Sequence, residues 1–215
     1  MESLLYIILS IGVILLLSLF IGSINLPSKN YNYYFSNILV NNLFQKAYSS
    51  FVSKKYNEAI KYYTKSIELR PDYAEAYYNR GLVYQHCKDQ IDKAINDYSK
   101  ALSLKPDYIE ALNNRGIAYA KKEKYDKALK DYTKAIKIMI KKNPNIYFNR
   151  ALIFTQMNLF EMAINDYTKA IELNPNFIAA YRNRSFLYKL IGDYVKSESD
   201  LEKIKELEQK YKFKF

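Results

Sequence analysis

The 215-residue chain contains no tryptophan, one cysteine and one histidine, and these shortages exclude several kinds of site. Cys87 alone cannot form an intramolecular disulfide, so the sequence requires neither an oxidising nor a reducing compartment. A zinc site needs three or four ligands, and a histidine-activated nucleophile would depend on His86 alone. The sequence also contains no glycine-rich phosphate loop and no paired-carboxylate motif. We therefore expect no catalytic residues, no metal and no cofactor, and hence no enzyme.

Glycine and proline are also scarce, at five residues each, and no stretch dense in them separates the recurring segments of the chain. The segment YYNRG, which ends at Gly81, returns as NNRG, FNRA and RNRS. The arginines of these segments lie 35, 35 and 34 residues apart. A repeat of this period without strand-like segments predicts an all-α solenoid.

Five units can be aligned on these arginines, with the boundaries 40–73, 74–108, 109–143, 144–177 and 178–211. When residues are numbered from 1 within each unit, positions 8, 20 and 27 are mostly small, whereas positions 4, 11 and 24 are mostly bulky. Large side chains that face small ones allow antiparallel helices to interdigitate. Position 8 holds Ala47, Gly81, Gly116, Ala151 and Ser185, and position 24 holds Tyr63, Tyr98, Tyr132, Tyr167 and Leu201.

With this pattern the chain resembles tetratricopeptide repeat (TPR) proteins over residues 40–211. The resemblance implies a right-handed superhelix of about five helix-turn-helix repeats. It also implies that the first helix of each repeat, helix A, lines a concave groove. The proline that ends the second helix, helix B, is missing from the third repeat, where Asn143 and Pro144 are expected to start the next helix as N-cap and first residue.

The groove that the resemblance implies would be lined by positions 2, 5, 6, 9, 12 and 13. Position 6 is an amide in every repeat, and a row of amides can pair with the backbone of an extended peptide of any sequence. Apolar side chains at positions 5 and 9 would flank the row. The alternative is that the amides only hydrogen-bond neighbouring repeats. The candidate peptide-binding residues are Gln45, Asn79, Asn114, Asn149 and Asn183 at position 6, Tyr48, Leu82, Ile117, Leu152 and Phe186 at position 9, and Phe44, Tyr78 and Phe148 at position 5.

A second binding mode of the family is the carboxylate clamp, which holds the C-terminal tails of heat-shock chaperones. It requires lysine at position 5 and asparagine at position 9 of one repeat, where this chain has Phe44 and Tyr48. It also requires lysine at position 2 and arginine at position 6 two repeats later, where this chain has Glu110 and Asn114. We therefore do not expect chaperone tails as partners.

Four repeats combine an arginine at position 7 with an aspartate at position 23, whereas the first repeat has Lys46 and Tyr62 at these positions. Joint presence and joint absence within one chain predict an ion pair between helices A and B, and not a set of ligand-binding groups. The predicted pairs are Arg80–Asp97, Arg115–Asp131, Arg150–Asp166 and Arg184–Asp200.

The formal charge of +11 permits anionic partners without identifying one. Lysine recurs at position 26 of every repeat, which predicts a basic stripe on the B helices. We interpret the stripe as a solvated face, and its alternative is attraction to anionic lipid or RNA. No aromatic platform accompanies it, so nucleic acid is not the favoured partner. The five lysines are Lys65, Lys100, Lys134, Lys169 and Lys203.

The N-terminal region contains an uncharged run of 23 residues, from Leu4 to Leu26. An α-helix of this length can cross a hydrocarbon layer of about 30 Å, so residues 1–27 are predicted to be a transmembrane signal anchor. Lysines follow the run and none precedes it, which favours a single-pass protein whose repeats face the cytoplasm. The alternative is a cleaved signal peptide and a secreted or periplasmic protein.

The remaining segments are a polar and aromatic stretch, residues 28–39, predicted as a short tether, and a tail, residues 212–215. The charged last helix is predicted to cap the repeats with a polar face. Together these features predict a membrane-tethered protein-protein interaction module that binds an extended peptide segment of a partner, as a scaffold or receptor. The alternative is a scaffold that docks on anionic membrane or RNA through its basic face.

Overall fold

The computed structural model describes residues 28–87 and 90–212, and the side chains of these except residues 28–35, 211 and 212. Within these ranges the chain forms ten α-helices and no strand, which confirms the predicted all-α class. The helices are α2 (Ser28–Val52), α3 (Tyr56–Leu69), α4 (Ala74–His86), α5 (Ile91–Leu104), α6 (Ile109–Lys121), α7 (Tyr125–Ile138), α8 (Pro144–Gln156), α9 (Phe160–Leu173), α10 (Ile178–Leu190) and α11 (Tyr194–Lys212).

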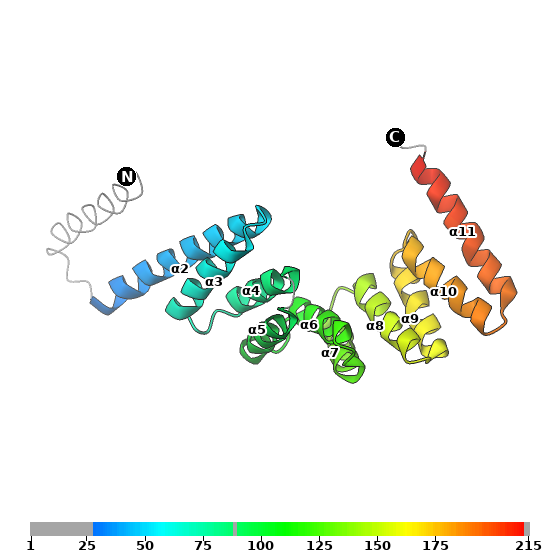
Figure 1. Cartoon of the computed structure of the whole chain (residues 1–215), viewed down its shortest axis with the longest axis horizontal. Coiled ribbons are helices and arrows are strands. Elements are labelled where there is room, and N and C mark those ends of the chain that lie inside the picture. The colour runs from blue at the N-terminus through cyan, green and yellow to red at the C-terminus, as the bar shows by residue number, and fades with distance from the viewer. Residues whose placement is uncertain (1–27, 88–89, 213–215) are drawn as a thin grey trace. The chain divides into compact units, whose positions relative to one another are not determined.

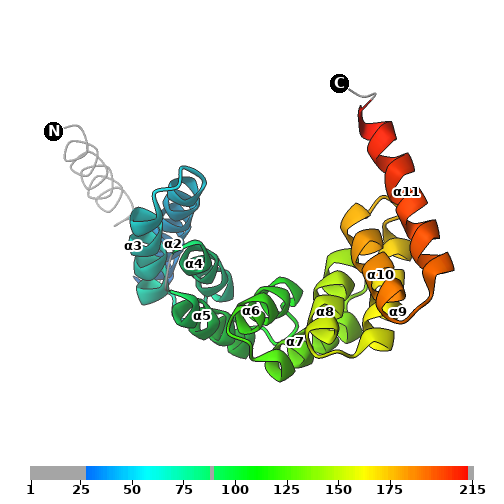
Figure 2. The same cartoon turned by 45° about the vertical axis from the view of Figure 1, so that its right-hand side comes forward.

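The chain divides into two compact units, Met1–Asn42 and Leu43–Phe215, and the second contains helices α3 to α11. In that unit each helix packs against the next, so that α4 with α5, α6 with α7, α8 with α9 and α10 with α11 form successive pairs (Figures 1 and 2). The A helices α4, α6, α8 and α10 begin at the first residues of the predicted repeats. Helix α4 also contacts α6, and α6 contacts α8, which places these A helices beside one another.

The turns between helices A and B share one backbone conformation in the repeats where they are described. Position 15 is left-handed in four repeats, with φ of 60° at Lys54, 56° at Glu123, 59° at Asn158 and 82° at Gly192. In each case the N–H of the following residue bonds a carbonyl oxygen five residues earlier, at 2.8 to 2.9 Å. This arrangement ends helix A and satisfies a carbonyl group that would otherwise lack a donor.

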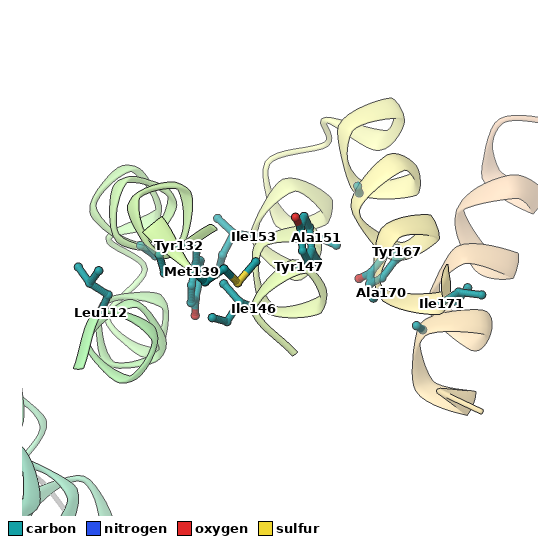
Figure 3. Packing of buried hydrophobic residues seen from close by; sticks show 14 of the residues in the cluster. Leu112, Tyr132, Met139, Ile146, Tyr147, Ala151, Ile153, Tyr167, Ala170 and Ile171 are labelled. Atoms are coloured by element: carbon teal, nitrogen blue, oxygen red, sulfur yellow. The ribbon is translucent and has the colours of Figure 1, made fainter. Parts of the chain in front are cut away.

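The core is built by the position-24 tyrosines, of which Tyr63, Tyr98, Tyr132 and Tyr167 are at most 1% exposed. A Cβ atom added to Gly81 would lie 2.7 Å from the Tyr98 ring, so glycine at position 8 lets the two helices of this repeat approach closely. Between the third and fourth repeats, Figure 3 shows Met139 beside Ile146 and Ile153, which belong to the same buried cluster. The predicted start of helix α8 is confirmed, because the Asn143 side chain accepts the N–H of Asn145 and Pro144 is the first helical residue.

Helix α11 departs from the other B helices at the positions that face a following repeat. Positions 21 and 28 are isoleucine or leucine in the first four repeats, whereas here they are Glu198 and Lys205, both exposed. This agrees with the predicted polar cap. The end is not uniformly polar, however, because Leu201 is 45% exposed and Val195 81% exposed.

The predictions for the two ends of the chain have different outcomes. Residues 28–39, predicted as a tether without helical periodicity, form the first part of α2, which continues without interruption to Val52. Residues 28–39 contain no glycine or proline. The first helix of the first repeat can therefore extend through this segment toward the N-terminus of the chain without interruption. The predicted anchor, residues 1–27, lies outside the described residues, as does most of the tail, although Lys212 belongs to α11. In the part of the chain that is described, no helix is long and apolar enough to span a membrane.

The hydroxyl groups of the position-24 tyrosines do not all have partners. Tyr98 Oη donates to Gln85 Oε1 at 2.8 Å, and the Tyr167 and Thr155 hydroxyls lie 3.4 Å apart. Tyr63 Oη is buried and has no hydrogen-bond partner among the described residues. Burial raises the pKa of Tyr63 above its usual value, so this unpaired hydroxyl is neutral. A buried donor without a partner costs free energy of folding.

We therefore predict that Tyr63→Phe raises the free energy of unfolding by about 1 kcal/mol, because it removes the unpaired hydroxyl and keeps the ring. The matched control is Tyr98→Phe, which removes a hydroxyl that has a partner and is expected to lower stability by a similar amount. Urea denaturation followed by circular dichroism measures both. Destabilisation by Tyr63→Phe would show that its hydroxyl is satisfied.

Candidate functional site

Each interface between successive repeats contains an arginine that joins three segments of the chain. Arg115, at position 7 of helix α6, donates from Nε and Nη2 to the two carboxylate oxygens of Asp131, both at 2.7 Å. Its Nη1 donates to Ser99 Oγ of the preceding repeat at 3.0 Å. Asp131 is 5% exposed, so the pair is largely removed from water. The predicted ion pair between helices A and B is confirmed in all four repeats, as Arg80–Asp97, Arg115–Asp131, Arg150–Asp166 and Arg184–Asp200.

The hydroxyl partner at position 25 is the part of this site that the sequence interpretation missed. Thr64, Ser99, Thr133 and Thr168 accept the third arginine bond, each from the repeat that follows. Their recurrence at one position was the available signal. Burial lowers the pKa of Arg115, but the hydrogen bond and charge of Asp131 raise it by more, so the group stays charged. With its donors committed inside the chain, the arginine serves to hold repeats together and is not a ligand-binding group.

The amide row at position 6 lies directly beside these arginines in the sequence. Asn114 Nδ2 donates to Tyr78 Oη at 2.9 Å, and Asn149 Nδ2 donates to Asn113 Oδ1 at 3.0 Å, so both amides bond the preceding repeat. Asn79 Nδ2 instead donates to the Glu75 carbonyl of its own helix at 2.7 Å. The bonds of Asn114 and Asn149 are the ones expected if the amides join neighbouring repeats, whereas the bond of Asn79 is not.

The same bonds leave one half of each amide available. Among the described residues, no donor reaches the Oδ1 atom of Asn79, Asn114 or Asn149. All three side chains are partly exposed, so these carbonyl oxygens can accept hydrogen bonds from outside the chain. At the ends of the row, Gln45 is exposed, and Asn183 is half-buried and interacts with the Tyr167 hydroxyl. The row therefore presents acceptors whose orientation is held by internal bonds.

The apolar candidates at position 5 take part in packing as well as in lining a surface. The ring centroid of Phe44 lies 5.4 Å from that of Tyr63, and Phe148 lies 5.6 Å from Tyr167. Tyr78 lies 5.9 Å from Tyr98 and 4.8 Å from the ring of Tyr108. These three side chains are half-buried by such contacts. Part of their surface therefore remains accessible to a ligand, and the Tyr78 hydroxyl also accepts the bond from Asn114.

The position-9 candidates are more accessible at the two ends of the row than in its middle. Tyr48 is 51% exposed and Phe186 is 58% exposed. On helix α10 Leu190, which is 53% exposed, lies one turn beyond Phe186 on the same face. The three central side chains, Leu82, Ile117 and Leu152, are half-buried. The accessible apolar area for a ligand therefore lies at the two ends of the row, on α2 and on α10.

The histidine and cysteine lie together in a cavity of about 570 Å³ at the turn that follows α4. The His86 ring stacks on Tyr56, with centroids 6.1 Å apart, and also lies against Phe51. Burial raises the pKa of the Cys87 thiol, and the nearby charge of Lys93 lowers it by less, so the thiolate is disfavoured. Over the described ranges, no group of three or more His, Cys, Asp or Glu side chains could hold a metal ion.

Paired antiparallel helices at a period of 34 or 35 residues, with small residues facing buried tyrosines, define an α-helical repeat protein. A family model described as "TPR repeat" matches residues 51–86 and 88–123. Two models described as "Tetratricopeptide repeat" match residues 109–138 and 144–177, and residues 166–199. The chain belongs to the tetratricopeptide repeat family. No curated protein matches it in sequence.

Several solved structures share this fold at low sequence identity. MamA from Desulfovibrio magneticus RS-1 superposes with a TM-score of 0.74 at 19% identity, over 80% of this chain and 96% of that one. PilF from Pseudomonas aeruginosa gives 0.70 at 20% identity, over 80% and 77% of the two chains. YrrB, described as a TPR protein with an unusual peptide-binding site, gives 0.66 at 21% identity, over 77% and 84%.

Because the aspartate of each pair is buried, we predict a large loss of stability when its arginine is removed. Arg115→Met leaves Asp131 buried without its partner, and we expect the free energy of unfolding to fall by about 3 kcal/mol or more. The matched control is Lys122→Met, which breaks the exposed pair with Asp92 and should lower stability much less, because water screens that pair. Urea denaturation of both variants measures the difference. Equal losses would contradict the assignment of the arginine as the residue that joins repeats.

Proposed function

We propose that this protein is an interaction scaffold whose A helices bind an extended peptide segment of a partner protein. The observation that supports this most directly is the row of amide oxygens on α4, α6 and α8. These oxygens have no internal donor among the described residues, while their Nδ2 groups are held by bonds inside the chain. A ligand that supplies backbone N–H groups at regular intervals fits such a row, because its side chains need not be recognised.

The surroundings of the row support a peptide that carries at least one large apolar side chain. Phe186 and Leu190 on α10 expose apolar surface next to Asn183, whereas the rings at position 5 are partly buried. The peptide backbone would pair with the amides, and an apolar side chain would rest on α10. No lysine occupies the clamp sites at Phe44 and Glu110, so the proposed ligand is not a chaperone C-terminal tail.

We place this scaffold at a membrane, with residues 1–27 as a single-pass anchor and the repeats on the cytoplasmic side. The support is in the sequence: 23 uncharged residues are long enough to cross the bilayer, and lysines follow them without any preceding. A cleaved signal peptide remains the alternative for this segment. Cleavage would be detected as a mature chain that begins near residue 24.

Peptide selection from an unbiased library, on the full chain in detergent, tests the groove. For selected peptides we expect a variant in which Asn79, Asn114, Asn149 and Asn183 are replaced together by Ala to bind at least tenfold more weakly, because it loses the three acceptors of the row and the Asn183 amide beside them. A variant with Lys65, Lys100, Lys169 and Lys203 replaced by Gln changes the B helices instead and should bind normally. Both variants must retain the native thermal unfolding transition. Unchanged binding to the asparagine variant would assign the amides a structural role only.

A further inference from the structure

Positive charge is concentrated in the third repeat. Residues 109–143 contain ten lysines and arginines and four acidic residues, a net charge of +6 out of +11 for the whole chain. Two of the fourteen charged groups, Arg115 and Asp131, neutralise each other inside the repeat. Most of the remaining charge lies on helix α7 and in the residues that flank it, which makes this one helix different from the other B helices.

Four lysines form a single stripe along α7. Lys127, Lys130, Lys134 and Lys137 are spaced by three, four and three residues, so they share one face of the helix. All four are exposed, and they lie opposite the buried residues Ala128, Asp131, Tyr132 and Ala135. We call these four lysines the α7 stripe.

The other B helices provide an internal comparison at the same four positions, which are 19, 22, 26 and 29. In α9 and α11 the lysine at position 26 is paired with a glutamate three residues later, as Lys169–Glu172 and Lys203–Glu206, both at 2.7 Å. The corresponding pair of residues in α7 is Lys134 and Lys137. Helices α3 and α5 carry two lysines each at the four positions, and α3 also carries two glutamates.

The stripe is not compensated by other charges. No described acidic side chain forms an ion pair with any lysine of the stripe. Asp126 lies one turn before Lys130 but does not pair with it either. Within the described ranges, the Lys127 ammonium lies 5.7 Å from the centre of the Tyr119 ring. Like charges one turn apart destabilise a helix, so folding alone does not account for four lysines here.

The segment that follows the stripe adds apolar surface. The third repeat lacks the proline that follows helices α3, α5 and α9, and Ile140 stands in its place, 100% exposed. Lys141 and Lys142 follow it, both exposed. A single exposed isoleucine is common on protein surfaces, but one that lies between Lys137 and Lys141 also suits a surface that has an anionic layer over an apolar one.

We infer that the α7 stripe and Ile140 bind the surface of a membrane that contains anionic lipid. Lysines supply several point charges to a layer of negatively charged headgroups, and Ile140 can enter the boundary below them. Single-stranded RNA would instead require aromatic side chains on which bases stack, and the stripe has none. This membrane contact is separate from the peptide groove, because it uses the exposed face of a B helix, and it does not depend on the proposed function.

The test is binding of the full chain to vesicles of phosphatidylcholine with and without about one third phosphatidylserine. The uncharged run from Leu4 to Leu26 would bind vesicles with and without phosphatidylserine equally. The difference in binding between the two kinds of vesicle therefore measures the electrostatic contact. Replacing the four stripe lysines by Gln is expected to lower the partition coefficient on the anionic vesicles by about a hundredfold. The matched control replaces Lys65, Lys100, Lys169 and Lys203 by Gln, which removes the same charge from other B helices, and a loss of at most about fivefold is expected.

Ile140→Ser should weaken binding to the anionic vesicles severalfold, and raising the salt from about 50 to 200 mM should weaken the native chain far more than the stripe variant. Equal losses in the stripe and control variants would overturn the assignment to α7, because net charge alone would explain them. Retention of vesicle binding by the stripe variant, together with loss of binding to a single-stranded RNA, would show that the partner is nucleic acid.

Discussion

The arrangement of the repeats depends on a half-buried guanidinium that recurs at each of the four interfaces between repeats. It binds both oxygens of an aspartate in its own repeat and a hydroxyl group in the preceding one. These bonds fix where helix A lies relative to two B helices at once. Buried charged pairs contribute more to geometry than to net stability, which comes mainly from the apolar contacts around the position-24 tyrosines. The amide at position 6 immediately precedes this arginine, so a restraint that joins the repeats also fixes the positions of the side chains that we propose bind a partner.

The division of each amide into an internal donor and an external acceptor reconciles the two interpretations of the asparagine row. Asn114 and Asn149 do join neighbouring repeats, through Nδ2. Because those bonds hold the amide planes, the Oδ1 atoms need not be ordered when a ligand arrives, and binding then costs less conformational entropy. Structural and binding roles are therefore compatible in the same side chain. Tyr78 at position 5 also has two roles, because its ring packs against Tyr98 and its hydroxyl accepts the bond from Asn114.

Much of the fold could be predicted because each packing position recurs in several repeats, so that its preference for small or bulky residues can be recognised in one sequence. Gly81 and Gly116 at position 8 predict a close approach of helices A and B. In the structure the rings of Tyr98 and Tyr132 occupy the space that a Cβ atom would need at these glycines. The helical state of residues 28–39 could not be predicted, because the segment lacks an amphipathic pattern. The partners of the amides depend on contacts between residues 36 apart, Tyr78 with Asn114 and Asn113 with Asn149, which no local pattern encodes. The basic stripe was expected across the repeats at position 26, whereas the structure separates the paired lysines of α9 and α11 from those that run along α7.

The chain thus presents two distinct surfaces, an acceptor row on its A helices and a cationic stripe on one B helix. The crystal structure of a complex with a selected peptide tests the central claim, which concerns the row, most directly. The account predicts peptide N–H groups about 2.7–3.2 Å from Oδ1 of Asn114 and Asn149, with the bonds from Nδ2 to Tyr78 and Asn113 unchanged. A peptide bound elsewhere, with both Oδ1 atoms uncontacted, would contradict it.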